Sequence, residues 1–213
     1  MTATIRDYRP SDERAAYWIC LKTGDHGADG EPFYRDDPDA LGRIYVGPYL
    51  RFEPNLALVL EDAEGVCGYA FGALDSRAFY ARYEREWRPA LCASFPEPTG
   101  DRSTWTRAQA VHYGYHHPEY DDAEPYAAYP SHLHIDLLPR AQGRGCGRAM
   151  MERLMERLRE RGSPGVHLAL SSLNPRAHRF YASLGFTELA RRADVDHETI
   201  IMGRRLGENA KSG

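Results

Sequence analysis

A glycine-rich stretch has residue types suited to ligand binding; it reads Gln142-Gly143-Arg144-Gly145-Cys146-Gly147-Arg148. The run before it, residues 133–139, is apolar like a strand, and the run after it has the spacing of a helix, with apolar residues at Met151, Leu154, Met155 and Leu158. Glycines let a ligand approach the backbone closely, and the first N–H groups of a helix point at anions. The sequence therefore predicts an anion-binding loop, to which Arg144 and Arg148 add positive charge.

The glycine spacing argues against two other phosphate-binding loops. A Walker loop needs Lys and then Ser or Thr after its last glycine, whereas Arg148 and Ala149 follow Gly147. A dinucleotide fingerprint needs Gly-x-Gly-x-x-Gly, whereas Gly143, Gly145 and Gly147 lie two residues apart. A strand-to-helix turn without a ligand is the remaining alternative.

Imidazole and carboxyl groups alternate along the apolar run that precedes the glycine loop. A period of two places His132, His134 and Asp136 on one face of a strand. A carboxylate within an apolar strand needs a charge partner or takes a raised pKa, and both conditions are common at catalytic sites. We expect Asp136 to act as a general base and His134 to be the second candidate, with a structural ion pair as the alternative. The spacing defines no further metal ligands, so no metal is expected.

The composition fits one globular domain over residues 1–206 and a flexible tail over 207–213. Of the 213 residues, 42% are hydrophobic and 27% charged, enough for a substantial core. The net charge of -4 argues against nucleic acid as the main partner, and no apolar run is long enough to span a membrane. The N-terminus lacks the apolar core of a signal peptide, and no Cys-x-x-Cys pair occurs. A cytoplasmic location is expected.

Alternating and apolar runs predict the strands of a sheet. They lie at 4–8, 56–61, 66–74, 133–138, 166–170, 186–190 and 199–206. A tight turn at 62–65 makes the second and third of them an antiparallel hairpin. Helices are expected after Ser11 or Asp12, after the glycine loop, and from Pro175 to Leu184.

Two segments interrupt this alternation of strands and helices. Residues 23–54 are rich in Gly, Asp and Pro, which predicts a loop region with one short helix at 38–46. Residues from about 76 to 131 contain no strand pattern, and helices are expected at 78–93 and 103–116. We interpret the second segment as a helical insertion.

The element order and three motifs resemble the GNAT N-acetyltransferases. The motifs are the glycine loop, Leu173-Asn174-Pro175, and Phe180-Tyr181-x-x-Leu184-Gly185-Phe186. The resemblance implies an α/β fold in which helices flank a central mixed sheet and the parallel fourth and fifth strands splay apart. The run 60–70 is also similar to the acetyltransferase-like C-terminal domain of animal O-GlcNAc hydrolases, whose glycine loop is degraded, whereas that loop is intact here.

The resemblance also implies acetyl-coenzyme A (acetyl-CoA) as the acyl donor and assigns roles to single residues. Backbone groups of Leu137 and Leu138 would pair with the pantetheine arm, and Asn174 would bind the arm from the opposite side. The pyrophosphate would lie on the loop residues Gln142, Gly143, Arg144, Gly145, Gly147 and Arg148. Tyr181 would lie near the sulfur and donate a proton to the leaving thiolate; its alternative role is a core aromatic.

Three function classes fit these features. The leading one is an acetyltransferase that transfers acetyl to an amine by direct attack in a ternary complex. The second is a non-catalytic acyl-CoA binder. The third is a protein-interaction module, and the intact glycines disfavour this third class. A small molecule or a peptide would serve as the acceptor. The aromatic and acidic stretch 112–122 suits either a cationic amine or a contact between two subunits of a homodimer.

Overall fold

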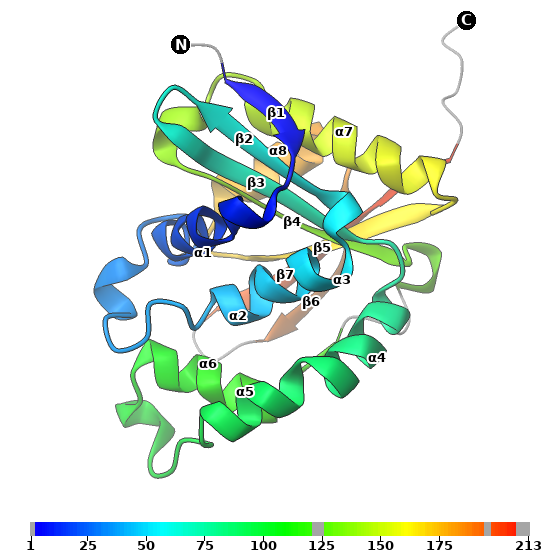
Figure 1. Cartoon of the computed structure of the whole chain (residues 1–213). Helices are drawn as coiled ribbons and strands as arrows, with labels where there is room; N and C mark the ends of the chain where they lie inside the picture. Colours follow the sequence, from blue (N-terminus) through cyan, green and yellow to red (C-terminus); the bar gives the residue numbers. More distant parts are fainter. Residues whose placement is uncertain (1–2, 121–125, 194–196, 208–213) are drawn as a thin grey trace, which may run out of the picture.

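A single mixed sheet runs through the centre of the chain. The structure is a computed structural model, and it describes residues 3–120, 126–193 and 197–207. The seven strands follow the order β1-β2-β3-β4-β5-β7-β6 (Figure 1). Their bounds are β1 Thr4–Asp7, β2 Ala57–Asp62, β3 Gly65–Ala73, β4 Ser131–Leu137, β5 Gly165–Ser171, β6 Thr187–Ala193 and β7 Glu198–Arg205. The predicted mixed sheet with parallel fourth and fifth strands is confirmed.

The parallel strands β4 and β5 pair only where they begin. Ser131 pairs with Val166 and His132 with His167, and β4 then continues to Leu137 with no further pair to β5 in the described chain. On its other side β4 stays paired with β3 along its length. A wedge-shaped gap therefore opens beside the second half of β4.

The register of β3 and β4 shows which backbone groups face this gap. Leu138 N–H donates to Cys67 O at 2.9 Å, which continues the antiparallel ladder past the end of β4. In such a ladder, alternate residues direct both backbone groups toward the partner strand. The N–H and C=O groups of Ile135 and Leu137 therefore point away from β3 and into the gap.

Helices cover both faces of the sheet (Figure 1). Their bounds are α1 Glu13–Lys22, α2 Gly42–Tyr45, α3 Gly47–Phe52, α4 Ser76–Glu86, α5 Arg88–Ser94, α6 Arg107–His116, α7 Cys146–Glu160 and α8 Pro175–Ser183. The neighbouring β3 residues Phe71 and Gly72 point to opposite faces. Phe71 contacts Tyr49 of α3, and Gly72 faces Leu154 of α7, so α3 and α7 lie on opposite sides of the sheet.

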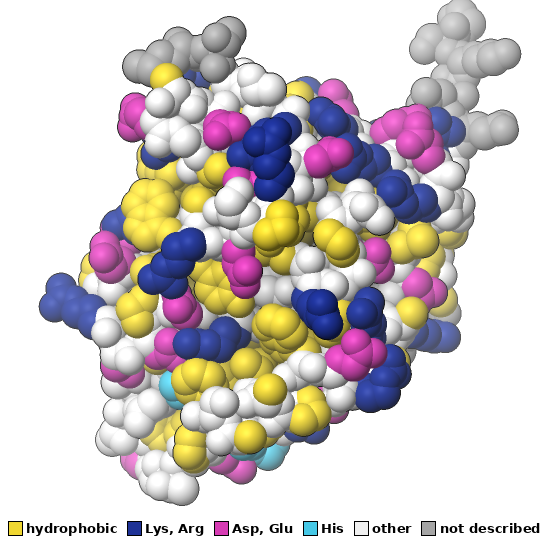
Figure 2. Space-filling model, in the orientation of Figure 1, with side chains coloured by type: hydrophobic (Ala, Val, Ile, Leu, Met, Phe, Trp, Pro, Cys, Tyr) yellow, Lys and Arg dark blue, Asp and Glu magenta, His cyan; other side chains and the backbone are white. Residues whose placement is uncertain are grey.

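Ion pairs and hydrogen bonds fasten α7 to the first strand. Arg157 pairs with Asp7 and donates to Asn55 O at 3.2 Å, and Arg153 donates to Ile5 O at 2.9 Å. The helix that begins at the glycine loop is thus fixed at its far end. Beyond these pairs, charged side chains of both signs are interspersed over the face drawn in Figure 2.

Several predicted helices differ in the structure, each for a local reason. The helix predicted at 78–93 is two helices, α4 and α5, which meet at Trp87 because Pro89 lies in the first turn of α5. The helix predicted at 38–46 is shortened to α2. The helix α3 was not predicted, because its Gly and Pro residues resemble a loop. The helix predicted at 103–116 is α6, which begins only at Arg107, because Thr106 and Gln109 form a capping box there.

The proposed insertion contributes α4, α5 and α6, which lie together below α2 and α3 in Figure 1. The side chain of Asp12 does not cap α1; it accepts from Arg9 N–H at 2.8 Å and pairs with Arg6. The tail predicted at 207–213 lies, apart from Gly207, outside the described residues. Within the described ranges, no helix is both long and apolar enough to cross a membrane.

We expect Leu154→Ala to lower the free energy of unfolding by about 2–5 kcal/mol, because it leaves a cavity in the core. Leu154 is completely buried, and its Cδ1 lies 3.2 Å from the position that a Cβ on Gly72 would occupy. Urea denaturation measures the change. Leu173→Ala is the control, because Leu173 is 54% exposed; equal losses for the two variants would contradict the assigned packing.

Candidate functional site

A cleft of about 480 Å³ lies beside the second half of β4, where β4 is no longer paired with β5. Its walls come from β4, the glycine loop, the start of α8 and the segment after α1. The lining residues are Thr23, Gly27, Ile135, Asp136, Leu137, Gln142, Gly143, Gly145, Gly147, Arg148, Asn174, Arg176, Ala177, Phe180 and Tyr181. Most residues that the sequence singled out therefore meet at one cleft, although they come from β4, the glycine loop, α7 and α8.

The glycine loop has the backbone conformation that its residues require. Gly143 and Gly145 have φ of 72° and 78°, in the left-handed region that favours glycine, and α7 starts directly after Gly145. A Cβ at either position would meet open space. A side chain at Gly147 would instead approach Phe180 of α8, with its Cβ 3.3 Å from the ring. The first two glycines are thus required by conformation and the third by packing.

Side chains at both ends of the loop bind it to the rest of the cleft. Gln142 Nε2 donates to Leu137 O at 2.6 Å and so occupies one of the two backbone groups that Leu137 directs into the gap. Arg148 donates to Ser183 Oγ at 3.0 Å, which joins α7 to α8. These contacts give Gln142 and Arg148 a structural role in addition to their place in the cleft wall.

Two of the expected donor-binding residues lie outside the cleft lining. Leu138 donates its N–H to Cys67 O and accepts from Ala141 N–H at 2.9 Å, so its backbone groups are used within the chain. The pantetheine contact expected at Leu138 would compete with these bonds, whereas Leu137 directs its backbone groups into the gap. Arg144 is exposed and also does not line the cleft. Its expected contact with a pyrophosphate stays a prediction.

The wall opposite the glycine loop is formed by Asn174 and by the segment after α1. Asn174 Oδ1 accepts from Ala177 N–H at 3.0 Å and so caps α8. Its Nδ2 lies 2.6 Å from the position that a Cβ on Gly27 would occupy. The sequence predicted a loop region at 23–54 but did not identify Thr23 and Gly27 as lining residues. The sequence signal for this wall was Gly27 itself. In the structure Gly27 has φ of 93° and approaches Asn174 closely, which a larger residue could not do.

Asp136 shares one carboxylate oxygen with two neighbours. Tyr69 Oη donates to Asp136 Oδ2 at 2.5 Å, and His134 Nε2 lies 3.1 Å from the same oxygen. Tyr69 and Asp136 are directly opposite in the β3–β4 register, and Tyr69 is completely buried. Asp136 lines the cleft, as a catalytic base would, and it is also held by two side chains, as a structural acid would be. Sequence reasoning missed Tyr69, although its alternation with Phe71 places it on the same face as the predicted acid.

Burial controls the protonation of the tyrosines around Asp136. For Tyr69, burial and then the charge of Asp136 raise the pKa well above its usual value. The same two causes raise the pKa of Tyr181. Both phenols therefore remain protonated at neutral pH and can donate hydrogen bonds.

The third member of the alternating set, His132, serves the insertion rather than the cleft. Its Nδ1 lies 2.8 Å from Ser76 Oγ at the start of α4, and Tyr80 stacks on its ring. Burial lowers the pKa of His132 well below its usual value, so the ring is neutral. Among the described residues, no three His, Cys, Asp or Glu side chains are grouped to hold a metal ion.

The aromatic and acidic stretch 112–122 binds the chain's own elements. Tyr115 Oη donates to Ala40 O at 2.8 Å, His116 Nε2 lies 2.8 Å from Phe95 O, and Tyr120 contacts Glu84. Residues 121 and 122 lie outside the described residues. These side chains join parts of the insertion to one another and to residue 40, and the acceptor or subunit surface expected here stays a prediction.

Comparisons with known proteins agree with this geometry. The model of the acetyltransferase (GNAT) family matches residues 31–186. Protein O-GlcNAcase of Rattus norvegicus is 31% identical over 204 residues, which is 95% of this chain but 22% of that protein, and the Mus musculus protein matches equally. The chain thus spans less than a quarter of the length of these curated relatives.

Solved structures show the same fold. SsHAT is 40% identical, with a TM-score of 0.87 over 98% of this chain and 100% of that chain. A phosphinothricin acetyltransferase from Sinorhizobium meliloti, solved with acetyl-CoA, is 19% identical, with a TM-score of 0.57 over 100% of this chain and 93% of that chain. The second likeness concerns the fold alone.

We expect Tyr69→Phe to lower the free energy of unfolding by about 1–3 kcal/mol, because it removes a hydrogen bond to a partly buried carboxylate. Urea denaturation of Tyr69→Phe, Asp136→Asn and the double variant measures the coupling between the two groups. Losses that simply add would show that the hydroxyl does not stabilise Asp136.

Proposed function

Because the chain belongs to the acetyltransferase (GNAT) family, we propose that it transfers the acetyl group of acetyl-CoA to an amine in a ternary complex. One observation carries the proposal: the cleft beside β4 brings the glycine loop, Asp136 and Tyr181 together. The acceptor is a small molecule or a peptide amine. We place this activity in the cytoplasm.

The donor would bind along the gap between the splayed strands. Backbone groups of Ile135 and Leu137 face the gap, where they can pair with the amides of a pantetheine arm. In the described chain no side chain caps the N-terminus of α7, so its first N–H groups are available to a pyrophosphate. Asn174 Nδ2 reaches the arm from the opposite wall, since Oδ1 is used in the cap of α8.

The transfer reaction needs one base and one acid. The amine nitrogen attacks the thioester carbonyl, the C–N bond forms, and the C–S bond breaks. Asp136 takes the proton that the nitrogen loses, and Tyr181 gives a proton to the departing sulfur, so the two transfers balance. Backbone N–H groups of β4 that face the gap stabilise the charge on the carbonyl oxygen.

His134 is the second candidate for the base. Its Nε2 lies 3.1 Å from Asp136 Oδ2, within the distance over which a proton can pass. His134 does not line the cleft, but its ring stacks on Tyr45, which is 40% exposed, so we infer a proton route from Asp136 through His134 toward the surface. An acceptor that arrives as an ammonium ion would lose its surplus proton by this route.

A non-catalytic acyl-CoA binder is the alternative function. The contacts of Asp136 with Tyr69 and His134 favour it, because they are what a structural ion pair would make. Binding of acetyl-CoA does not separate the two functions. Measured turnover does.

Acetyl-CoA at about a hundred times its dissociation constant should stabilise the chain by roughly 2.7 kcal/mol, a rise of several degrees in Tm. Gly145→Val should remove this rise, because a β-branched side chain at φ of 78° distorts the loop and projects into the open space beside it. Thermal unfolding with and without ligand measures both effects.

Gly100→Val is the matched control, because Gly100 also has a left-handed φ of 91° and open space around it but lies in the insertion. A parent protein whose Tm does not respond to saturating acetyl-CoA would refute the proposed donor.

Tyr181→Phe should lower kcat by about a hundredfold or more, while the dissociation constant of acetyl-CoA stays nearly constant, because only proton donation is lost. The raised pKa of Tyr181 keeps the acid form through mildly alkaline pH, so Tyr181 should not limit activity there. Coupled assays of thiol release with a panel of primary amines measure the rates. Tyr83→Phe, at a buried tyrosine of α4, is the control; parental rates in Tyr181→Phe would leave Tyr181 as a packing residue.

A further inference from the structure

One wall of the cleft is built by a segment with little regular structure. Residues 23–40 follow α1 and contain only a short 3-10 helix, Glu31–Phe33. Within them a tight turn at 25–28 is closed by hydrogen bonds between Asp25 and Ala28. Gly27 lies in this turn, lines the cleft and approaches Asn174. The position of the turn therefore decides where the wall formed by Gly27 and Asn174 stands relative to the glycine loop and β4.

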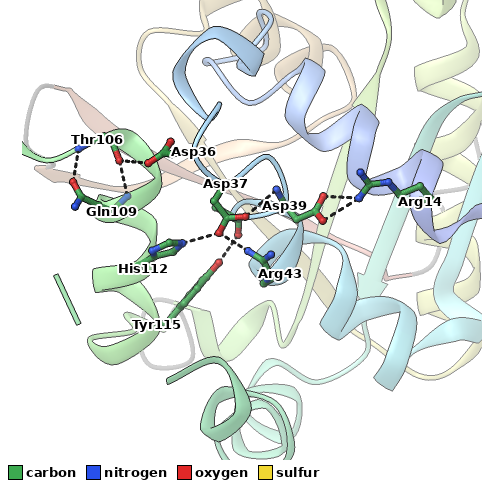
Figure 3. A network of polar contacts seen from close by, with 10 residues as sticks. Arg14, Asp36, Asp37, Asp39, Arg43, Thr106, Gln109, His112 and Tyr115 are labelled. Atoms are coloured by element: carbon green, nitrogen blue, oxygen red, sulfur yellow. Dashed lines mark hydrogen bonds and ion pairs between the residues drawn. The ribbon is translucent and has the colours of Figure 1, made fainter. Parts of the chain in front are cut away.

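The insertion helix α6 binds this segment at successive points (Figure 3). Arg107 Nη1 donates to Asp25 Oδ1 at 2.5 Å, inside the turn itself. Further along, Thr106 Oγ1 donates to Asp36 Oδ2 at 2.7 Å, and His112 Nε2 lies 2.7 Å from Asp37 Oδ2. Polar groups at the start and in the middle of α6 thus bind three aspartates of the segment.

The contact between α6 and the segment includes a partly buried charge cluster around Asp37. Asp37 also accepts from Arg43 of α2 at 2.6 Å, and Tyr115 Oη donates to Ala40 O in the interior. Burial acts to raise the pKa of Asp37, but the hydrogen bonds from Arg43 and His112 outweigh it and lower the pKa. Asp37 therefore stays ionised at neutral pH and anchors the segment between α2 and α6.

The contact between α6 and the 25–28 turn depends on Arg107. Its guanidinium also lies over the ring of Phe33, 4.0 Å from the centroid, so one side chain holds both the turn and the 3-10 helix that follows. The capping box of Thr106 and Gln109 fixes the start of α6, where Arg107 is the first helical residue. None of the α6 residues lines the cleft.

We propose that α6 is a clamp that sets the position of the 25–28 turn, and hence the width of the cleft, with Arg107 as a positioning residue. The inference rests on the proposed function only in taking acetyl-CoA as the ligand. It assigns the insertion a role in the site even though the insertion contributes no lining residue. An exposed ion pair alone is weak, but here the pair adds to a cation–π contact in an otherwise irregular segment.

Hydrogen exchange and calorimetry on the full chain test the clamp. In Arg107→Met, amides of residues 23–34 should exchange about three- to tenfold faster, and the dissociation constant of acetyl-CoA should rise by a similar factor. Exchange in β3 and β4 should not change, and Tm should fall by less than about 2 °C. Arg107→Lys should restore much of the affinity, because it keeps the charge beside Asp25.

Arg102→Met is the matched control, because the Arg102 guanidinium lies over the rings of Tyr113 and Trp105, both within the insertion. Asp25→Asn should reproduce the effect of Arg107→Met, and the double variant should be no worse than either single one. Parental exchange of residues 23–34 in Arg107→Met would overturn the proposal, as would faster exchange with unchanged affinity. A parent that binds no acetyl-CoA would refute the proposed function, while the exchange data would still decide whether α6 holds the turn.

Discussion

The separation of β4 from β5 after two paired residues is the constraint on which the site depends. A strand that loses its neighbour in the middle of a sheet leaves backbone N–H and C=O groups without partners, which is costly unless water or a ligand replaces them. Gln142 satisfies one such carbonyl, that of Leu137, and the others face the cleft. The fold therefore maintains a row of backbone groups that are suited to an extended, amide-containing ligand.

The same separation explains why Asp136 can lie in an apolar strand. One side of β4 is covered by the β3 ladder, which places Tyr69 directly across from the carboxylate. The other side is open, so the carboxylate has a hydrogen-bond donor behind it and the cleft in front of it. A closed sheet at this point would have required a second buried partner for the charge.

Motifs confined to one stretch of chain could be predicted from the sequence, whereas contacts between distant segments could not. The glycine loop, the strand before it and the helix after it form a local unit, and its residues do line the cleft. Tyr69 was missed because its partner lies 67 positions away, and only the strand register brings them together. The helix α3 was missed because Gly47 and Pro48 suggested a loop, while burial of Tyr49 and Leu50 stabilises a helix there.

The two walls of the cleft differ in how they are held. The wall that contains the glycine loop is built on α7, whose far end is bound to β1 and whose start is bound to β4 and α8. The opposite wall is an irregular segment that loses much conformational entropy when it is ordered and depends on side chains of α6 to offset that loss. Such a segment can adjust at lower cost than a helix packed on a sheet. Loss of the contacts to α6 would therefore change the cleft chiefly at the 25–28 turn, while the glycine loop keeps its place beside β4.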